Sequence, residues 1–203
     1  MVRVKICGIT TIEDARVAID AGADALGFVF HPESPRCIDP EGAAGIIGQL
    51  PPFVQTVGLF VNRPTDFVNR TADFCRLDLV QLHGDEPPAF CDKVARRVIK
   101  AFRVKDISSL DPIRHYRAAA FLLDAYSPKA YGGTGLTFNW EAAKVAKAYG
   151  PIILAGGLTP DNVREAVKTV IPYAVDVSSG VESGPGKKDP AKVREFIRRA
   201  KGL

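Results

Sequence analysis

The sequence predicts a (βα)8 barrel that forms one domain over residues 1–203. Short apolar runs rich in β-branched residues alternate with longer amphipathic stretches along the chain, as in parallel strands joined by helices. The alternation gives eight units, and eight is the number of strands that closes this barrel. A length of 203 residues, 46% of them hydrophobic, supplies one large core. An open, doubly wound sheet is the alternative that alternation alone permits.

The eight units are read in order along the chain. Their strands are predicted at 2–7, 24–30, 54–61, 77–83, 97–104, 119–126, 151–157 and 173–179. The helices are predicted at 11–22, 39–50, 64–76, 86–96, 105–117, 138–150, 159–170 and 189–203. Pro112 would interrupt the fifth helix, so we expect a short helix or a loop in its place.

Helix ends carry residues suited to them. Four predicted helix starts have a polar residue able to cap the first turn: Thr11, Asp39, Thr159 and Asp189. Three predicted ends have a glycine, which adopts positive φ readily: Gly22, Gly150 and Gly202. These signals support the helix assignments.

Composition argues against several classes of protein. The 27 Lys and Arg against 23 Asp and Glu give a net charge of +4, far from the basic stripe of a nucleic-acid-binding protein. Four cysteines without a C-x-x-C pair, beside three histidines, argue against a zinc site or a disulfide framework. No signal peptide is evident, and no apolar run approaches the roughly 18 residues of a membrane helix. We expect a cytoplasmic protein without bound metal and without a nucleic-acid or membrane partner.

Two neighbouring strand ends predict a phosphate site. Gly156 and Gly157 follow the seventh strand, and Ser178, Ser179 and Gly180 follow the eighth. The carboxyl ends of barrel strands carry the active site, and the loops after strands 7 and 8 often bind phosphate through backbone N–H groups and a helix N-terminus. Most glycine pairs only mark turns, so the position in two adjacent loops is what favours this interpretation.

A thiol and a carboxyl end two further strands, the first at Cys7 and the sixth at Asp124. Strands 1 and 6 flank strands 7 and 8 in a closed barrel, so the two side chains can face each other across a substrate whose phosphate lies between them. Such a pair suits proton transfer between carbon and oxygen. Taken singly, Cys7 could be packing and Asp124 a loop cap; together, above a phosphate site, they favour catalysis.

Other polar residues are weaker candidates. Arg36, in the loop after strand 2, can bind a carboxylate bidentately, although a surface arginine is the alternative. His83 ends the fourth strand and could either make a structural hydrogen bond or take part in catalysis. We expect packing roles for the remaining candidates: Cys37, Cys75, Cys91 and Trp140.

Seven motifs carry a resemblance to a known family. They are KICGIT, LGFVFHPESPR, VQLHG, LLDAY, GGTG, LAGGLTPDNV and DVSSGVESGPGKKD, in the family's order from end to end. With them the chain resembles the phosphoribosylanthranilate isomerases of tryptophan biosynthesis. Two positions depart from the family pattern: Asn139 stands where Asp is expected, and Cys37 where an aromatic residue is expected.

The resemblance implies a (βα)8 barrel that converts N-(5-phosphoribosyl)anthranilate into its open-chain 1-deoxyribulose isomer by Amadori rearrangement, without a cofactor. It implies that Cys7 is the general base, Asp124 the general acid and Arg36 the partner of the anthranilate carboxylate. The phosphate loops are those at 156–157 and 178–180. Asp124 must then hold a proton near neutral pH, and a lowered pKa would favour the role of Cys7, since few free thiols are ionised there.

Two other functions remain as alternatives. The related aminoimidazole carboxamide ribotide isomerases are expected to use two aspartates, where this chain has Cys7, and a second phosphate site that would need a glycine pair after strand 3. A non-catalytic metabolite-binding barrel would need the phosphate loops but neither Cys7 nor Asp124. The sequence leaves the oligomeric state open between monomer and homodimer.

Overall fold

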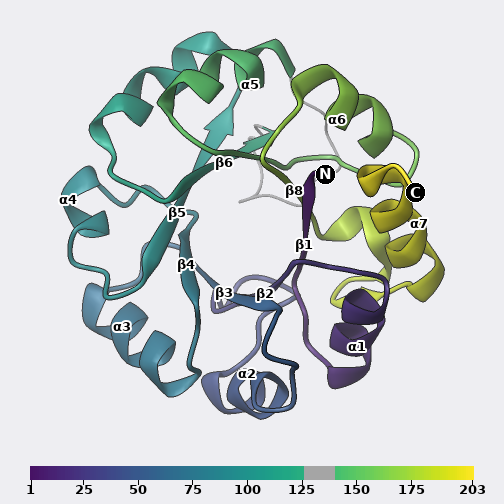
Figure 1. Ribbon diagram of the computed structural model, residues 1–203. Coiled ribbons are helices and arrows are strands. Elements are labelled where there is room, and N and C mark those ends of the chain that lie inside the picture. The colour runs from purple at the N-terminus through teal and green to yellow at the C-terminus, as the bar shows by residue number, and fades with distance from the viewer. Residues whose placement is uncertain (126–139) are drawn as a thin grey trace.

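The computed structural model describes residues 1–125 and 140–203. Eight parallel strands close into a barrel in sequence order, with β8 hydrogen-bonded to β1 (Figure 1). The strands are β1 (Arg3–Cys7), β2 (Ala25–Val29), β3 (Gln55–Phe60), β4 (Leu79–Leu82), β5 (Arg97–Val104), β6 (Ala120–Ala125), β7 (Ile152–Leu154) and β8 (Ala174–Val177). The closed barrel predicted from the alternation is confirmed, and the open sheet is wrong.

Helices surround the barrel. They are α1 (Ile12–Asp20), α2 (Pro40–Ile47), α3 (Thr65–Phe74), α4 (Pro88–Cys91), α5 (Trp140–Ala146), α6 (Val163–Val170) and α7 (Pro190–Lys201), with the 3-10 helices η1 (Ile107–His115), η2 (Lys147–Tyr149) and η3 (Ser179–Val181). A small hairpin of β9 (Glu182–Gly184) and β10 (Lys187–Lys188) precedes α7.

The fifth helix is replaced by η1, which contains Pro112, as expected. The fourth helix is also short, with four residues in α4 where we expected residues 86–96. Pro88 occupies its first turn, a position proline favours, and β5 already starts at Arg97. The chain between them has little room for further turns.

Three of the four predicted caps are confirmed. The side chains of Thr11, Asp39 and Asp189 accept hydrogen bonds from the first backbone N–H groups of α1, α2 and α7. The cap at Thr159 is wrong, because α6 starts only at Val163. Thr159 instead accepts a hydrogen bond from the backbone N–H of Asp161. The residues between β7 and α6 therefore form a longer loop at the barrel mouth.

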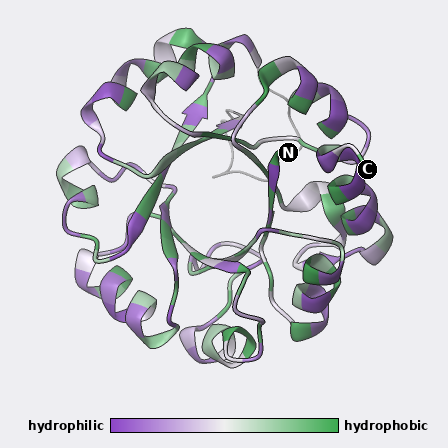
Figure 2. Cartoon of the chain, viewed as in Figure 1, coloured by the Kyte–Doolittle hydropathy of each residue, from purple (hydrophilic) through white to green (hydrophobic). Residues whose placement is uncertain are grey.

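The core has two parts that follow from strand alternation. One set of strand residues packs outward against the helices, and the other fills the barrel interior. Figure 2 shows largely hydrophobic strands surrounded by helices with mixed hydrophobic and hydrophilic positions. The interior cluster consists of Val57, Leu79, Ile99, Ala101, Ala120, Leu122, Ile153, Ala155 and Ala174.

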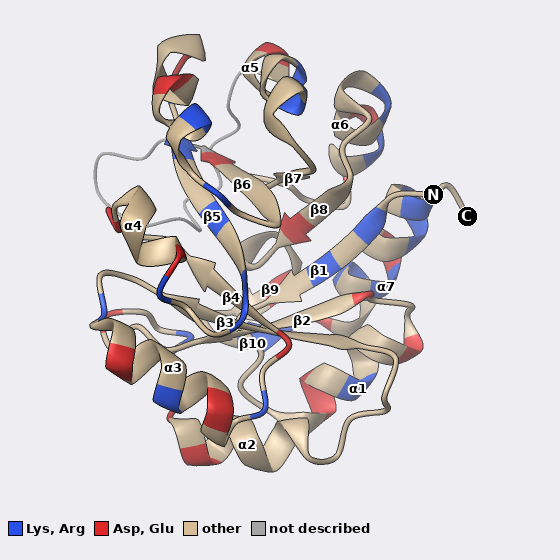
Figure 3. Cartoon of the chain, turned by 60° about the vertical axis from the view of Figure 1, so that its left-hand side comes forward, with Lys and Arg blue, Asp and Glu red and all other residues tan. Residues whose placement is uncertain are grey.

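The interior is not entirely apolar. Lys5, Gln81 and Asp176 are buried polar residues on barrel strands. Figure 3 shows a basic segment on β1 near an acidic one on β8, the two strands whose pairing closes the barrel. A buried charge requires a partner, and Lys5 and Asp176 form an ion pair with each other.

Within residues 1–125 and 140–203, no helix has the length and hydrophobicity that a membrane span requires.

Candidate active site

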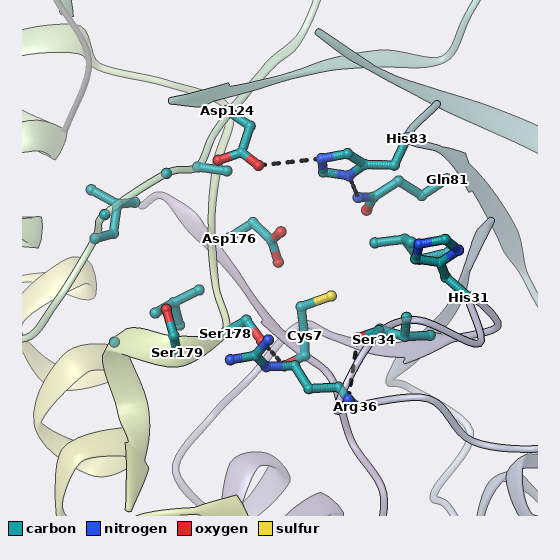
Figure 4. Close-up of a pocket in the computed structure, with 18 of the residues that line it drawn as sticks. Cys7, His31, Ser34, Arg36, Gln81, His83, Asp124, Asp176, Ser178 and Ser179 are labelled. Carbon is teal, nitrogen blue, oxygen red and sulfur yellow. Dashed lines mark hydrogen bonds and ion pairs between the residues drawn. The ribbon is translucent and has the colours of Figure 1, made fainter. Parts of the chain in front are cut away.

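The predicted site residues meet in one pocket at the carboxyl ends of the strands. It is lined by Cys7, Arg36, Asp124, Gly156, Gly157, Ser178, Ser179 and Gly180. His83 lines it too, with further polar residues that the sequence did not point to: His31, Ser34, Gln81 and Asp176. Figure 4 shows Cys7 and Arg36 on one side, and Asp124, His83 and Gln81 on the other. This opposition of a thiol and a carboxyl is the arrangement predicted from strand order.

Cys7 is the last residue of β1, and 4% of its surface is exposed. Lys5 lies two residues earlier on the same inward face and makes an ion pair with Asp176 of β8, with 2.9 Å between Nζ and Oδ1. A Cβ on Gly27 would lie 2.7 Å from Cys7 Sγ and 3.0 Å from Lys5 Nζ. The missing side chain of Gly27 thus leaves the space in which the thiol and the ammonium group approach each other.

The electrostatics of Cys7 combine opposing effects. Burial raises the pKa of the Cys7 thiol, and the Lys5 ammonium opposes part of that rise by stabilising the thiolate. Burial also disfavours the charge on Lys5, but Asp176 and Cys7 outweigh this effect and raise the pKa of Lys5. The net direction for Cys7 is opposite to the lowered pKa that its role as a base would favour. The thiolate is therefore a minor form at neutral pH, kept accessible by a cation beside it.

Asp124 lies on β6, and 4% of its surface is exposed. Its Oδ2 is 3.2 Å from Nε2 of His83, and Nδ1 of His83 is 2.8 Å from Nε2 of Gln81. His83, which the sequence left between two roles, is hydrogen-bonded to the candidate acid. The carboxyl thus belongs to a buried row of three polar side chains from β4, its C-terminal end and β6.

Arg36 is held by a carboxylate of this chain. Its Nε and Nη2 donate to Oε1 and Oε2 of Glu182 at 2.8 and 2.7 Å, and Lys188 Nζ donates to Oε1 at 2.8 Å. Burial disfavours ionisation of Glu182, but these donors outweigh it and lower the pKa of Glu182. One bidentate edge of Arg36 is occupied, so a substrate carboxylate would have to use the edge formed by Nη1 and Nη2.

The two glycine loops are shaped for close approach. Gly156 and Gly157 have φ of 81° and 67°, in the left-handed region that favours glycine. The side chain of Asn162 accepts from the backbone N–H of Thr159 and donates to the carbonyl of Gly157. A Cβ on Gly180 would lie 1.9 Å from the carbonyl oxygen of Leu158. The loops after β7 and β8 therefore touch, with no room for a side chain at Gly180.

The helix after β8 is shorter than expected for an anion site. It is η3, with three residues, so backbone N–H groups rather than a long helix dipole are available at this loop.

The remaining cysteines and Trp140 divide into two groups. Cys75 and Cys91 are buried, and Trp140 packs against the core, so their packing roles are confirmed. Cys37 is exposed, and the packing role expected for it is wrong because its loop runs over the surface. The GGTG motif at 132–135 and Asn139 lie outside the described residues.

Three of the polar residues that the sequence analysis overlooked follow one rule. Lys5 precedes Cys7 by two positions, Gln81 precedes His83 by two and Asp176 precedes Ser178 by two. Residues two apart in a strand share a face. A search for polar residues at alternate positions before each strand end would have found all three. Glu182 and Lys188 lie beyond β8, where no strand periodicity points to them.

Comparisons with known proteins identify the family. Residues 4–199 match the model of a family described as N-(5'-phosphoribosyl)anthranilate isomerase. The chain belongs to this family. It is 82% identical to the enzyme of that name from Geobacter sulfurreducens, with all of both chains covered. It is also similar to a crystal structure of phosphoribosyl anthranilate isomerase from Thermotoga maritima, with 45% identity, a TM-score of 0.93 and full coverage of both chains.

A second solved structure carries a ligand. It is a phosphoribosyl anthranilate isomerase in complex with reduced 1-(o-carboxyphenylamino)-1-deoxyribulose 5-phosphate, and it is 44% identical to this chain, with a TM-score of 0.89 and full coverage of both chains. The relative therefore binds a compound that contains a carboxylate, a sugar chain and a phosphate.

Proposed function

We propose that this chain isomerises N-(5'-phosphoribosyl)anthranilate to 1-(2-carboxyphenylamino)-1-deoxyribulose 5-phosphate, an Amadori rearrangement of tryptophan biosynthesis. The observation that carries the proposal is the opposition of Cys7 and Asp124 across one pocket, above two touching glycine loops. Membership of the isomerase family supports it. We place the reaction in the cytoplasm, in keeping with four free cysteines.

The substrate would lie across the mouth of the barrel. Its phosphate would bind the loops at Gly156–Gly157 and Ser178–Gly180, where backbone N–H groups can approach an anion closely. Its carboxylate would bind the Nη1 and Nη2 edge of Arg36, which Glu182 leaves open. The ribose would then lie between Cys7 and Asp124. No metal or organic cofactor is required by this chemistry.

The first step opens the ring. Asp124 donates a proton to the ring oxygen of the furanose, the bond from that oxygen to C1' breaks, and the lone pair of the anilino nitrogen forms the C1'=N bond of a protonated Schiff base. The carboxylate that remains on Asp124 accepts a hydrogen bond from Nε2 of His83. Charge that develops on the acid is thereby stabilised within a buried site.

The second step moves a proton from carbon. The Cys7 thiolate removes the proton from C2', and the electron pair of that bond forms C1'=C2' while the C1'=N pair returns to nitrogen. The resulting enolamine gives the ketone when its C2' hydroxyl loses a proton and C1' gains one. Lys5 stabilises the thiolate before the transfer, and the protonated Schiff base makes the C2' proton acidic enough for a base of this strength.

The function can be tested by generating phosphoribosylanthranilate in situ and following the loss of its fluorescence when the protein is added. We expect rapid loss together with formation of the deoxyribulose product by mass spectrometry. Fluorescence that decays only at the rate without enzyme would contradict the proposal.

A further inference from the structure

We propose that Gln81 is a positioning residue that prevents protonation of His83 at Nδ1, so that the proton taken up by the His83–Asp124 pair resides on Asp124, where the substrate needs it. The proposal rests on the proposed function only for the use of that proton. The protonation state of His83 can be measured whether or not the protein turns over this substrate.

The row of three side chains is enclosed by the barrel. Exposure is 0% for Gln81, 7% for His83 and 4% for Asp124. Gln81 extends from β4, and His83 follows two positions later on the same face. Apolar interior residues lie on the same strands as the row, Leu79 on β4 and Leu122 on β6. In such surroundings hydrogen bonds decide which protonation states are stable, because water cannot replace a missing partner.

The contact between Gln81 and His83 has a fixed polarity. An amide nitrogen donates hydrogen bonds and has no lone pair with which to accept one. With Gln81 Nε2 at 2.8 Å, Nδ1 of His83 must accept. His83 is then neutral and carries its hydrogen on Nε2, which points to Oδ2 of Asp124 at 3.2 Å. A proton added to Nδ1 would place two donors against each other.

The direction of this hydrogen bond determines where the His83–Asp124 pair binds an additional proton. The His83–Asp124 pair can take up one more proton in two ways: on Nδ1, which gives an imidazolium facing a carboxylate, or on Asp124, which gives a neutral histidine beside a carboxylic acid. Gln81 disfavours the first. In the second, Oδ2 keeps its hydrogen bond from His83 and Oδ1 carries the proton. Only that arrangement leaves an acid that can protonate a ring oxygen.

This orientation of the amide leaves its oxygen without a hydrogen bond to any described residue. Gln81 Oε1 is buried and has no hydrogen-bond partner within the described part of the chain. Rotation of the amide by 180° would give Oε1 a donor at Nδ1 and would favour the imidazolium. An amide that faces His83 with its nitrogen, although its oxygen is left without a partner, selects the neutral histidine.

Other ionisable groups share the pocket with the pair. They are Cys7 on β1, His31 after β2, Arg36 in the following loop and Asp176 on β8, with Lys5 paired to Asp176 below them. The variants used for the test leave all of these unchanged, so a change at His83 can be assigned to Gln81.

The test is the nitrogen-15 NMR spectrum of the histidine side chains at neutral pH in the full chain. The sequence has three histidines, and His31 and His115 serve as internal references. In the parent we expect His83 to show an unprotonated Nδ1 and a protonated Nε2. In Gln81→Glu, whose carboxylate accepts a hydrogen bond from Nδ1, we expect both nitrogens to be protonated. In Gln81→Met, which cannot donate a hydrogen bond and is only a weak acceptor, we expect the fraction of His83 with a protonated Nδ1 to rise above that of the parent, by less than in Gln81→Glu. The control is Gln55→Glu, which makes the same charge change at an exposed position on β3.

Kinetics supply the second measurement. We expect kcat at neutral pH to fall about 10- to 100-fold in Gln81→Glu and Gln81→Met, less than the roughly 10²- to 10⁴-fold for loss of a general acid, because Asp124 itself remains. KM should stay within about twofold, because none of the surface of Gln81 is exposed. If Gln81→Glu fails to fold, Gln81→Met carries the same test. A doubly protonated His83 in the parent, or a neutral His83 with undiminished kcat in Gln81→Met, would overturn the proposal. An inactive parent with a neutral His83 would instead count against the proposed function alone.

Discussion

The two sides of the pocket are built differently. On the thiol side, Cys7 is surrounded by fixed charges, which pair as Lys5 with Asp176 and as Arg36 and Lys188 with Glu182. On the carboxyl side, the contacts of Asp124 run through His83 to the amide of Gln81. A buried thiol becomes a base only if a cation offsets the effect of burial. A carboxyl acts as an acid only if its surroundings do not hold it as an anion. Lys5 opposes part of the effect of burial on Cys7, and Asp124 is hydrogen-bonded to His83 with no cation paired to it among the described residues other than this histidine.

The largest effects should come from the two reacting groups. Cys7→Ser removes the anion near neutral pH, and Asp124→Asn removes the proton that opens the ring. We expect kcat to fall by about 10²- to 10⁴-fold in each, the usual range for loss of a general acid or base, with product binding retained by calorimetry. A Cys7→Ser variant that turns over near the parental rate would show that Cys7 is a packing residue.

A substitution at Arg36 tests whether the thiol side of the pocket binds the substrate carboxylate. Arg36→Ala should raise KM by about 10- to 100-fold, the value of a hydrogen bond to a charged group, with a smaller change in kcat, because the carboxylate is bound alike in ground and transition states. Glu182 keeps Lys188 as a partner in this variant, so the fold should be retained. An unchanged KM would place the carboxylate elsewhere.

A substitution at Gly180 tests phosphate binding independently of the thiol side and the carboxyl side of the pocket. A methyl group in Gly180→Ala would meet the Leu158 carbonyl and push the two loops apart. Inhibition by inorganic phosphate should weaken by about tenfold or more, the loss of one charge-assisted hydrogen bond. Gly184→Ala is the matched control, because a Cβ there meets nothing within 4 Å. Equal inhibition constants in the two variants would argue against a phosphate site at these loops.

Lys5 tests how the thiol side works. Because burial raises the pKa of Cys7 and Lys5 opposes that rise, removal of the cation in Lys5→Gln should raise the pKa further. The thiolate fraction increases as pH rises through the pKa, so the pH profile for alkylation of Cys7 should move to higher pH, with a rate at neutral pH lower by about tenfold for each pKa unit. Lys100→Gln removes another buried lysine with a carboxylate partner, Glu86, and should leave this profile unchanged.

The contrast between the two sides also shows what the sequence could reveal. Strand periodicity was sufficient for the eight strands and for the positions of Cys7 and Asp124 at two strand ends, and the count of eight favoured closure. It did not reveal the pairing of Lys5 with Asp176, which lie 171 residues apart. That ion pair depends on the register between β1 and β8, which only barrel closure defines.

Local signals failed where tertiary contacts outweighed them. Thr159 before a proline looks like a helix cap, yet Asn162 holds the loop in another shape and delays the start of α6. The pKa of Cys7 depends on burial and on neighbours from three segments of the chain, so its direction was beyond the reach of sequence. The row from Gln81 to Asp124 joins β4 to β6 across the barrel interior, which likewise requires the closed fold.

The most direct test asks whether the two sides act in different steps. Reduction of each reaction mixture with borodeuteride places deuterium at C1' if the Schiff base has accumulated and at C2' if the ketone has formed, and mass spectrometric fragmentation separates the two. Cys7→Ser should open the ring and stop, giving label at C1' above the level of a mixture without enzyme. Asp124→Asn should give no more than that level. Label at C1' in Asp124→Asn as high as in Cys7→Ser, or none above the enzyme-free level in Cys7→Ser, would contradict the division of acid and base between the two sides of the pocket.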